Sequence, residues 1–358
     1  MSALALGGGP LLAQARSDAL GGAEYRSVSF GSGLGIASLK ELAVPLGLAI
    51  PMGSRLSLDA GTFFVSAQSQ DGAGSSTTIN GLTDVIVHGA YQIRPDVAVL
   101  TFSASVPTGH KTLSGQQQQI ANAVATDLVP FPVTNFGSSF SVTTGLAYAT
   151  PVGPWALGLA GSFRYASSYQ PISDSGFSTL TIKPGAEMRL RLGADRIVGQ
   201  GRLSLGVTYS TFSNDEIGSQ SQSPGTRLIP QFTWSTPMGR NNSVVFYGWD
   251  VYRNVDESAS VTGAVRQNTF ALGASASLRS GANTLQPLFE LRKGWQGPGG
   301  LHNAGTLVGL GLRYQMAAGE RMTLTPGFRL DLGNLATSSG GSASVSGLSV
   351  SLTARTSF

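Results

Sequence analysis

Apolar and polar positions alternate with a period of two along almost the whole chain from Ile36 to Phe358. In 321–334, Met, Leu, Pro and Phe residues share one parity, whereas Thr, Gly, Arg and Asp residues occupy the other. Successive side chains of a β-strand point to opposite faces, so this alternation predicts strands with one apolar and one polar face. Segments 178–192 and 304–316 show the same pattern. About fifteen such stretches follow one another.

The connections between these stretches alternate in length. Short connections lie near 51–54, 94–96, 151–154, 193–198, 238–242, 281–283 and 317–320. Longer connections lie near 69–78, 108–136, 167–177, 213–224, 256–266, 297–303 and 335–345. In outer-membrane barrels the short turns are periplasmic and the long loops extracellular. The sequence therefore predicts an all-β fold, a transmembrane antiparallel up-and-down β-barrel.

The number of strands follows from where the chain ends. The strand that ends at Phe358 runs toward the short turns, which predicts a periplasmic C-terminus. An even number of strands returns the other end of the barrel to the same side, so Ala23–Gly33 is expected to be a further strand. We expect sixteen strands, or fourteen if two weak strands merge. No separate plug domain is expected, because about twenty residues precede the first strand.

Residues 1–15 contain no charge and end in Ala13-Gln14-Ala15. A small-x-small end after an apolar stretch is typical of a signal-peptidase site, although a basic segment before it is missing. We expect 1–15 to be a signal-peptide remnant and 16–358 to form a single outer-membrane barrel domain. The alternative is a short apolar N-terminus with a chance match.

Composition narrows the class of protein further. Charged residues make up 12% of the 358 residues, about half the usual share of a soluble chain, and 48 residues are glycine. A net charge of +4 beside a hydrophobic fraction of 41% argues against disorder. Pro and Gly interrupt every apolar run, which excludes a bundle of membrane helices. The absence of cysteine excludes disulfides, thiolate metal sites and cysteine nucleophiles.

The two faces of the predicted strands differ in side-chain size. One face carries Leu, Val, Phe, Tyr and Trp and is expected to contact lipid, while the other is mostly small, as in 143–149 and 204–210. Small polar side chains cannot fill a wide interior at close-packed density, so the lumen is expected to be wet. An Arg at mid-membrane on the lipid face would cost roughly 2–4 kcal/mol, so charged side chains are expected inside. The predicted lumen-lining residues are Arg164, Lys183, Glu187, Arg189, Arg191, Arg202, Arg227, Asp250, Arg279, Glu290, Arg292, Arg313, Arg329, Asp331 and Arg355.

Several of these arginines are predicted to lie near the short turns, namely Arg189, Arg191, Arg202, Arg279, Arg313 and Arg355. One interpretation is a cationic zone whose field favours anionic or polar solutes. The alternative is that arginine–carboxylate pairs, such as Glu290 with Arg292, only stiffen the barrel wall.

The longest predicted loop, 108–136, is apolar for a loop and contains a predicted short helix within Gln116–Leu128. Two interpretations stay open, and in one of them Leu128, Phe131 and Phe136 carry this loop into the barrel mouth and narrow it. The alternative is a disordered extracellular loop.

Catalytic chemistry finds little support in the sequence. The chain has three histidines, and none forms a local signature with a nucleophile and a carboxylate, although a meeting of His110 with Asp127 above the barrel stays open. Metal-ligand spacing and nucleotide fingerprints are missing, and the basic residues are dispersed. We therefore expect no enzyme, no catalytic residue, no metal, no cofactor and no nucleic-acid partner.

Two segments resemble known barrel proteins. The last strand, 348–358, resembles the C-terminal signal of outer-membrane barrels, which implies that Phe358 is read by the barrel-assembly machinery. Gly81-Leu-Thr-Asp84 before a strand and Pro107-Thr-Gly109 after the next are similar to the "transporter" family linked to meta-pathway phenol degradation. The general barrel resemblance covers nearly the whole chain, whereas this motif match covers about thirty residues.

These observations predict an outer-membrane channel for the passive passage of small solutes, which prefers anions if the cationic zone sets the field. The expected partners are outer-membrane lipid and lipopolysaccharide, the assembly machinery and small solutes, with the long loops extracellular. The alternative functions are a barrel anchor whose outer loops act in adhesion or structure, and an outer-membrane hydrolase.

Overall fold

The computed structural model describes residues 17–174, 180–255, 265–297, 300–337 and 339–358. Sixteen antiparallel wall strands form a closed β-barrel, and the described residues contain no separate plug domain. One wall strand is interrupted at Thr83 and Asp84, so it consists of two segments, β4 and β5, which both pair with β3. The wall consists of β1 (Asp18–Phe30), β2 (Ser38–Met52), β3 (Leu56–Gln70), β4 (Ser76–Leu82), β5 (Val85–Arg94), β6 (Ala98–Val106), β7 (Ser141–Val152), β8 (Trp155–Ala166), β10 (Glu187–Val198), β11 (Gly201–Phe212), β14 (Thr226–Met238), β15 (Asn242–Asn254), β16 (Arg266–Ser280), β17 (Asn283–Gly297), β18 (His302–Ala317), β19 (Met322–Ala336) and β20 (Ser342–Ser357).

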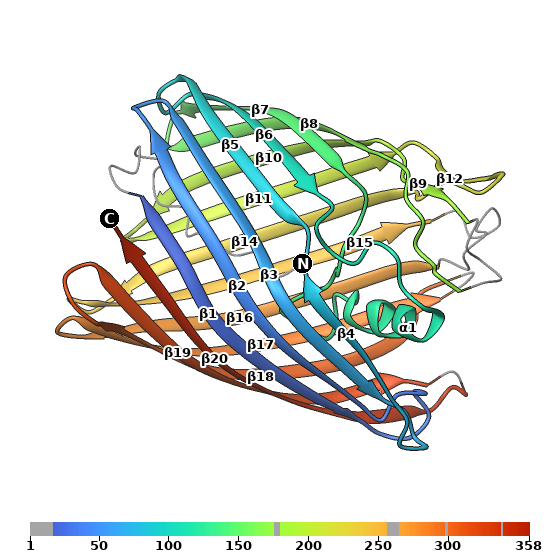
Figure 1. Ribbon diagram of the computed structural model, residues 1–358. Helices are drawn as coiled ribbons and strands as arrows, with labels where there is room; N and C mark the ends of the chain where they lie inside the picture. The colour runs from blue at the N-terminus through green and yellow to red at the C-terminus, as the bar shows by residue number, and fades with distance from the viewer. Residues whose placement is uncertain (1–16, 175–179, 256–264, 298–299, 338) are drawn as a thin grey trace.

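The barrel closes where β1 pairs with both β2 and β20. Asp18 lies opposite Ser357, so the first wall strand starts and the last one ends at the same end of the barrel, on the left in Figure 1. This end carries the short turns, including 53–55 and 153–154, whereas the longer connections lie at the other end. The predicted sixteen strands and the sorting of connections by length are therefore confirmed. The predicted signal-peptide remnant, 1–15, lies outside the described residues.

A second, smaller sheet lies at the long-loop end. Its strands are β9 (Ile182–Lys183), β12 (Asp215–Ile217) and β13 (Gln220–Gln222) (Figure 1). The prediction of one strand over 178–192 was therefore wrong, because the wall strand β10 begins only at Glu187. Pro184 has no backbone N–H to donate to a ladder, and the N–H of Gly185 donates to the Asp215 carboxylate instead. Burial raises the pKa of the Asp215 carboxyl, an effect that this hydrogen bond partly opposes.

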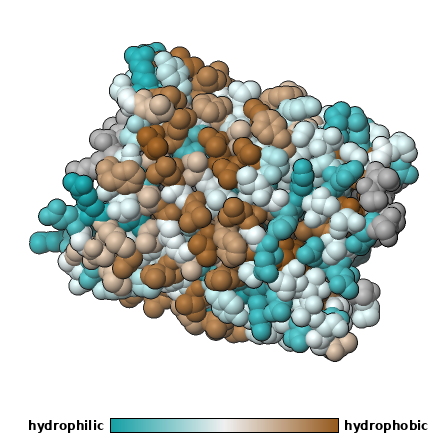
Figure 2. Space-filling model, in the orientation of Figure 1, coloured by the Kyte–Doolittle hydropathy of each residue, from teal (hydrophilic) through white to brown (hydrophobic). Residues whose placement is uncertain are grey.

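Apolar side chains project outward from alternate positions of the wall strands. Leu190, Leu205, Leu310 and Val350 are examples of this exposed set. Figure 2 shows such side chains as a brown band between more hydrophilic ends of the barrel. A belt of this kind matches the hydrocarbon layer of a membrane. No helix among the described residues is both long and apolar enough to span a membrane.

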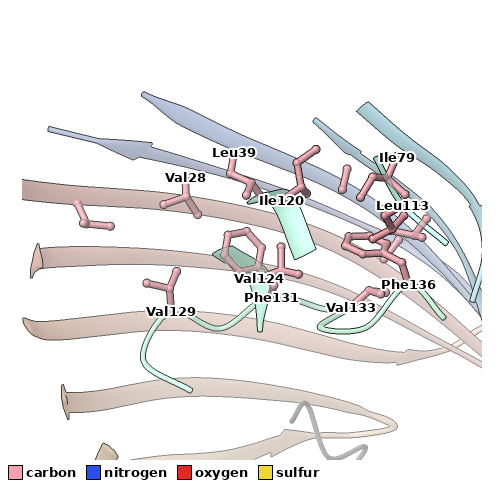
Figure 3. Close-up of a cluster of buried hydrophobic side chains, with 14 of the residues drawn as sticks. Val28, Leu39, Ile79, Leu113, Ile120, Val124, Val129, Phe131, Val133 and Phe136 are labelled. Carbon is pink, nitrogen blue, oxygen red and sulfur yellow. The ribbon is translucent and has the colours of Figure 1, made fainter. Parts of the chain in front are cut away.

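The buried apolar core of the molecule lies inside the barrel. It joins wall residues such as Val28, Leu39 and Val65 to residues of the connection between β6 and β7. We call this connection, residues 107–140, the central loop; it contains the helix α1 (Gly115–Val124). Figure 3 shows Ile120 and Phe131 of the loop beside wall side chains. The expected short helix is therefore present, and the loop packs against the inner wall.

Candidate functional site: the barrel lumen

The polar faces of the wall strands line the lumen and carry most of the predicted charged residues. The inward positions are identified by ion pairs and loop contacts, and they alternate with the exposed apolar positions. The strand register gives this inward parity to Arg164, Glu187, Arg189, Arg191, Arg202, Arg227, Arg279, Glu290, Arg292, Arg313, Arg329, Asp331 and Arg355.

Two of the predicted lumen residues lie elsewhere. Lys183 is in the small sheet, where its ammonium lies 3.0 Å from Glu216. Asp250 faces outward, because Tyr247 and Arg253 of the same strand reach the lumen carboxylates of Glu290 and Asp127. Near the long-loop end of β15, Asp250 hydrogen-bonds the side chain of Asn268 on the neighbouring strand. This partner reduces the cost of an outward carboxylate, which the alternation pattern could not reveal.

A group of ion pairs joins wall strands on the lumen side at mid-height. We call this group the mid-barrel network; it consists of Arg26, Glu290, Arg292, Arg329 and Asp331. The guanidinium of Arg329 lies 2.8 Å from both Asp331 and Glu290. Arg26 and Arg292 complete the network with contacts of 2.9 Å to Asp331 and 2.8 Å to Glu290. Arg26 is only 2% exposed and Asp331 is fully buried. Such buried charges require their partners, because each would otherwise lose its hydration without compensation.

Tyr247, on strand β15, extends the mid-barrel network. Its hydroxyl donates to Glu290 over 2.9 Å. The ring lies across Gly273, where an added Cβ would come within 2.3 Å of the ring carbon Cζ. Glycine is therefore required at position 273 to let the phenol reach Glu290.

A second group of ion pairs surrounds Glu187. Its carboxylate lies 2.7 Å from Arg189 and 3.1 Å from Arg227. Because β10 runs from Glu187 at the long-loop end to Val198 at the short turn, the predicted place of Arg189 and Arg191 near the short turns was wrong: both lie nearer the long-loop end. Nearer the short turns, Arg202 pairs with Asp195 and Arg355 with Asp18.

Four of the predicted arginines make no ion pair with any described residue. These are Arg164, Arg191, Arg279 and Arg313. Arg191, Arg279 and Arg313 are exposed to the lumen solvent. The two sequence interpretations therefore apply to different residues: some arginines form ion pairs within the wall, and others form none with a described residue.

The central loop crosses the lumen and is anchored at several points. Its Asp127 carboxylate lies 2.8 Å from Arg253, and its Asp127 carbonyl accepts from Arg292 over 3.0 Å. Farther along, the Val133 N–H donates to the fully buried Glu41 over 2.8 Å. The guanidinium of Arg26 lies over the Phe131 ring, 5.4 Å from its centre. These contacts hold the loop against β15, β17, β1 and β2.

The residues predicted to constrict the barrel mouth are all buried in this packing. Leu128, Phe131 and Phe136 are at most 5% exposed. They therefore fix the loop to the wall, and the solvent-facing side of α1 is formed by polar residues such as Gln116, Gln119 and Asn122.

Asp84 fastens both ends of the central loop, and we call this arrangement the Asp84 latch. One carboxylate oxygen accepts the N–H of Gly109 over 3.1 Å, and the other accepts the N–H and hydroxyl of Ser138, each over 2.8 Å. Thr108 donates to the Thr83 carbonyl and accepts from the Val85 N–H, which replaces ladder bonds where the wall strand is interrupted. The latch joins the Gly-x-x-Asp and Pro-Thr-Gly sequence motifs in space.

Gly109 must be glycine for the latch to close. A Cβ there would lie 2.3 Å from the Phe136 carbonyl oxygen and 3.0 Å from the backbone nitrogen of Asp84. Contacts that short do not occur, so this backbone approach depends on the missing side chain.

Sequence reasoning missed Arg26, Glu41 and Tyr247. Arg26 and Glu41 share the parity of apolar wall residues such as Val28 and Leu39, so a charge among inward apolar positions was the available signal. It points to a buried partner rather than to an open lumen, because an unpaired buried charge is costly.

The contacts of two histidines bear on the catalytic pairing that the sequence left open. His110 contacts the Asn80 carbonyl, whereas Asp127 pairs with Arg253, so the suggested meeting of His110 and Asp127 does not occur. His88 contacts Asp59 over 3.1 Å. No group of three or more His, Asp or Glu in the described ranges is placed to hold a metal ion.

Comparison with known proteins gives a result only at the level of structure. No model of a known protein family matches the chain, and no curated protein matches its sequence. CdiB from Acinetobacter baumannii aligns with a TM-score of 0.51 and 11% identity over 94% of this chain and 60% of that one. The fold is that of an outer-membrane β-barrel.

Two further structures align with somewhat lower TM-scores. A bacterial polysaccharide outer membrane secretin has a TM-score of 0.49 and 11% identity, covering 94% of this chain and 98% of that one. OprB from Pseudomonas putida has a TM-score of 0.47 and 12% identity, covering 96% and 94%. No family model supports the resemblance to the meta-pathway transporters, whose motif residues here form the Asp84 latch.

Proposed function

We propose that the protein is a passive outer-membrane channel for small solutes and that its lumen favours anions. The observation that carries this proposal is a set of solvent-exposed lumen arginines that form no ion pair with a described residue, namely Arg191, Arg279 and Arg313. A fixed charge acts over about 8–10 Å at physiological to 0.1 M salt. Within a narrow lumen such charges raise the local concentration of anions and lower that of cations.

The solute path runs along the half of the lumen that the central loop leaves open. Inner-face residues of β7 and β8 near their short turn, such as Ala149 and Ala156, are exposed, whereas Val28 and Leu39 beneath the central loop are fully buried. The loop narrows the lumen from one side, and small side chains form the other.

The short-turn end faces the periplasm in this proposal, and the long connections face outward. Phe358, at the short-turn end, is 60% exposed, which fits a terminal residue that the assembly machinery reads. Trp155 and Arg196 face outward at the same end, with the guanidinium 5.4 Å from the ring centre. An aromatic–cation pair at this level suits the lipid headgroup region.

Single-channel recording in a planar bilayer tests the proposal. Purified protein should produce discrete conductance steps, and a potassium chloride gradient should give a reversal potential of the sign that chloride selectivity requires. Absence of conductance in correctly assembled protein would contradict the channel and favour a barrel that acts through its outer loops. Conductance with cation selectivity would support the channel function and contradict the proposed anion preference.

A further inference from the structure

A polar cavity lies at the short-turn end of the lumen, and we call it the turn-end pocket. It has a volume of about 360 Å³ and is lined by strands β15 to β18 and the turn before β15. Ser277, Thr284, Gln286 and Gln315 contribute from inward positions of three neighbouring strands. A cavity of this size is within the range of small-ligand sites.

The chemistry of the pocket is that of an anion receptor. Arg240 and Arg279 both line it, and none of its lining residues is a carboxylate. The remaining lining groups are amides and hydroxyls, which can donate further hydrogen bonds. Guanidinium groups bind carboxylate and phosphate oxygens through paired N–H donors.

The charge of the pocket is uncompensated by the described part of the chain. Neither Arg240 nor Arg279 forms an ion pair there, and the same is true of Arg313, which lies opposite Gln286 on the adjacent strand. Elsewhere in the lumen, gathered arginines alternate with carboxylates, as in the mid-barrel network. Two neighbouring guanidinium groups without a carboxylate repel each other, and a mobile anion between them removes that repulsion.

We infer that the turn-end pocket binds a small, doubly charged oxyanion, a dicarboxylate or a phosphate, as it passes the short-turn end of the lumen. The statement that the anion passes through the lumen rests on the proposed channel function, whereas binding of the anion to the pocket does not. Arg240 and Arg279 hold one anionic oxygen group each, or one phosphate between them. The amide and hydroxyl groups hold the uncharged part of the solute.

Equilibrium binding to the detergent-solubilised full chain is the first test. Titration calorimetry with sodium phosphate and with sodium succinate should detect binding to the wild-type protein and weaker binding of acetate. The double variant Arg240→Gln with Arg279→Gln should lose about tenfold in affinity or more, because it removes two charge-assisted contacts. The matched control is Arg55→Gln with Arg94→Gln, which removes the same charge at other short turns.

The second test is block of the chloride current in a planar bilayer. Phosphate or succinate is added on the short-turn side. The concentration that blocks the current should be lower for the wild type than for the pocket variant. The single variant Arg279→Lys, which keeps the charge, should retain most of the block. Heat-modified mobility on gels verifies that each variant is a folded barrel.

The outcomes separate the inference from the proposed function. Binding and block by both anions, lost in the pocket variant and kept in the control, support a site for dianions in general; an effect of phosphate or succinate alone assigns the site to that class. Equal binding by the wild type and the pocket variant, or none by either, overturns the inference even if chloride conductance is normal. Binding without any conductance would support the anion site in the turn-end pocket and would contradict the proposed channel function.

Discussion

The mid-barrel network and the short-turn end of the lumen are both rich in inward-facing arginines, yet they differ in partners and burial. Arg26 and Arg329 contact carboxylates within 3 Å, and Arg26 lies under the central loop. Arg279 and Arg313 have no such partner among the described residues and are exposed. The same residue type in the same strand parity therefore forms wall ion pairs in one region and forms none with the described residues in the other.

The difference follows from the free energy of hydration. A buried guanidinium must recover its lost hydration from a carboxylate, so Asp331 and Glu290 accompany the arginines that the loop covers. An exposed guanidinium keeps its water and needs no partner, and its field extends into the lumen. Stability and selectivity should accordingly respond to different substitutions.

The largest expected effect is on stability, from Asp331→Asn. This change leaves the buried Arg26 without its anionic partner and removes one partner of Arg329. Loss of one member of a buried pair costs about 3–5 kcal/mol. Thermal unfolding followed by circular dichroism and by heat-modified mobility should show a clear decrease in the midpoint. A midpoint equal to that of the wild type would show that the network does not hold the wall together.

An intermediate effect is expected from Asp84→Ala, which opens the Asp84 latch. The loop ends at Gly109 and Ser138 lose their shared acceptor, and hydrogen bonds to a charged group contribute about 1.5–3 kcal/mol each. A less constrained central loop should make the single-channel current noisier and its mean conductance higher. The control is Asp59→Ala, a wall carboxylate whose side chain is 39% exposed and lies 3.1 Å from His88. Equal current noise in both variants would contradict the positioning role of Asp84.

The smallest effect on stability is expected at the short-turn end, from Asp195→Asn. Its partner Arg202 is 54% exposed and Asp195 is 38% exposed. Exposed pairs contribute about 0–1 kcal/mol, so the unfolding midpoint should barely move. A loss as large as that of Asp331→Asn would abolish the distinction between the two regions.

The sequence predicted the barrel because a period of two is a local property that each strand displays on its own. Strand number, the sorting of connections and the inward parity of residues such as Arg292 and Arg313 followed from it. The short helix in the central loop was predicted from its local composition. Its capping box, Ser114 with Gln117, is likewise local.

Features that depend on distant partners were not predictable in this way. Arg26 is buried beside Asp331, far along the chain, and the parity of Arg26 indicates a buried partner without identifying Asp331. Asp250 faces outward beside Asn268, a neighbour known only once the strands are paired. The strand boundary at Glu187 moved Arg189 away from the short turns, because Pro184 and Gly185 interrupt an otherwise regular alternation. The turn-end pocket requires four strands in register.

The central claim is that arginines without partners set the selectivity of the lumen, and the reversal potential in a salt gradient tests it most directly. The triple variant Arg191→Gln, Arg279→Gln and Arg313→Gln removes uncompensated charge at similar side-chain length. A matched variant, Arg202→Gln with Asp195→Asn and Arg355→Gln with Asp18→Asn, removes two ion pairs and no net charge. The account predicts a shift toward cation selectivity for the triple variant and the wild-type potential for the pair variant. A folded triple variant with the wild-type potential would contradict it.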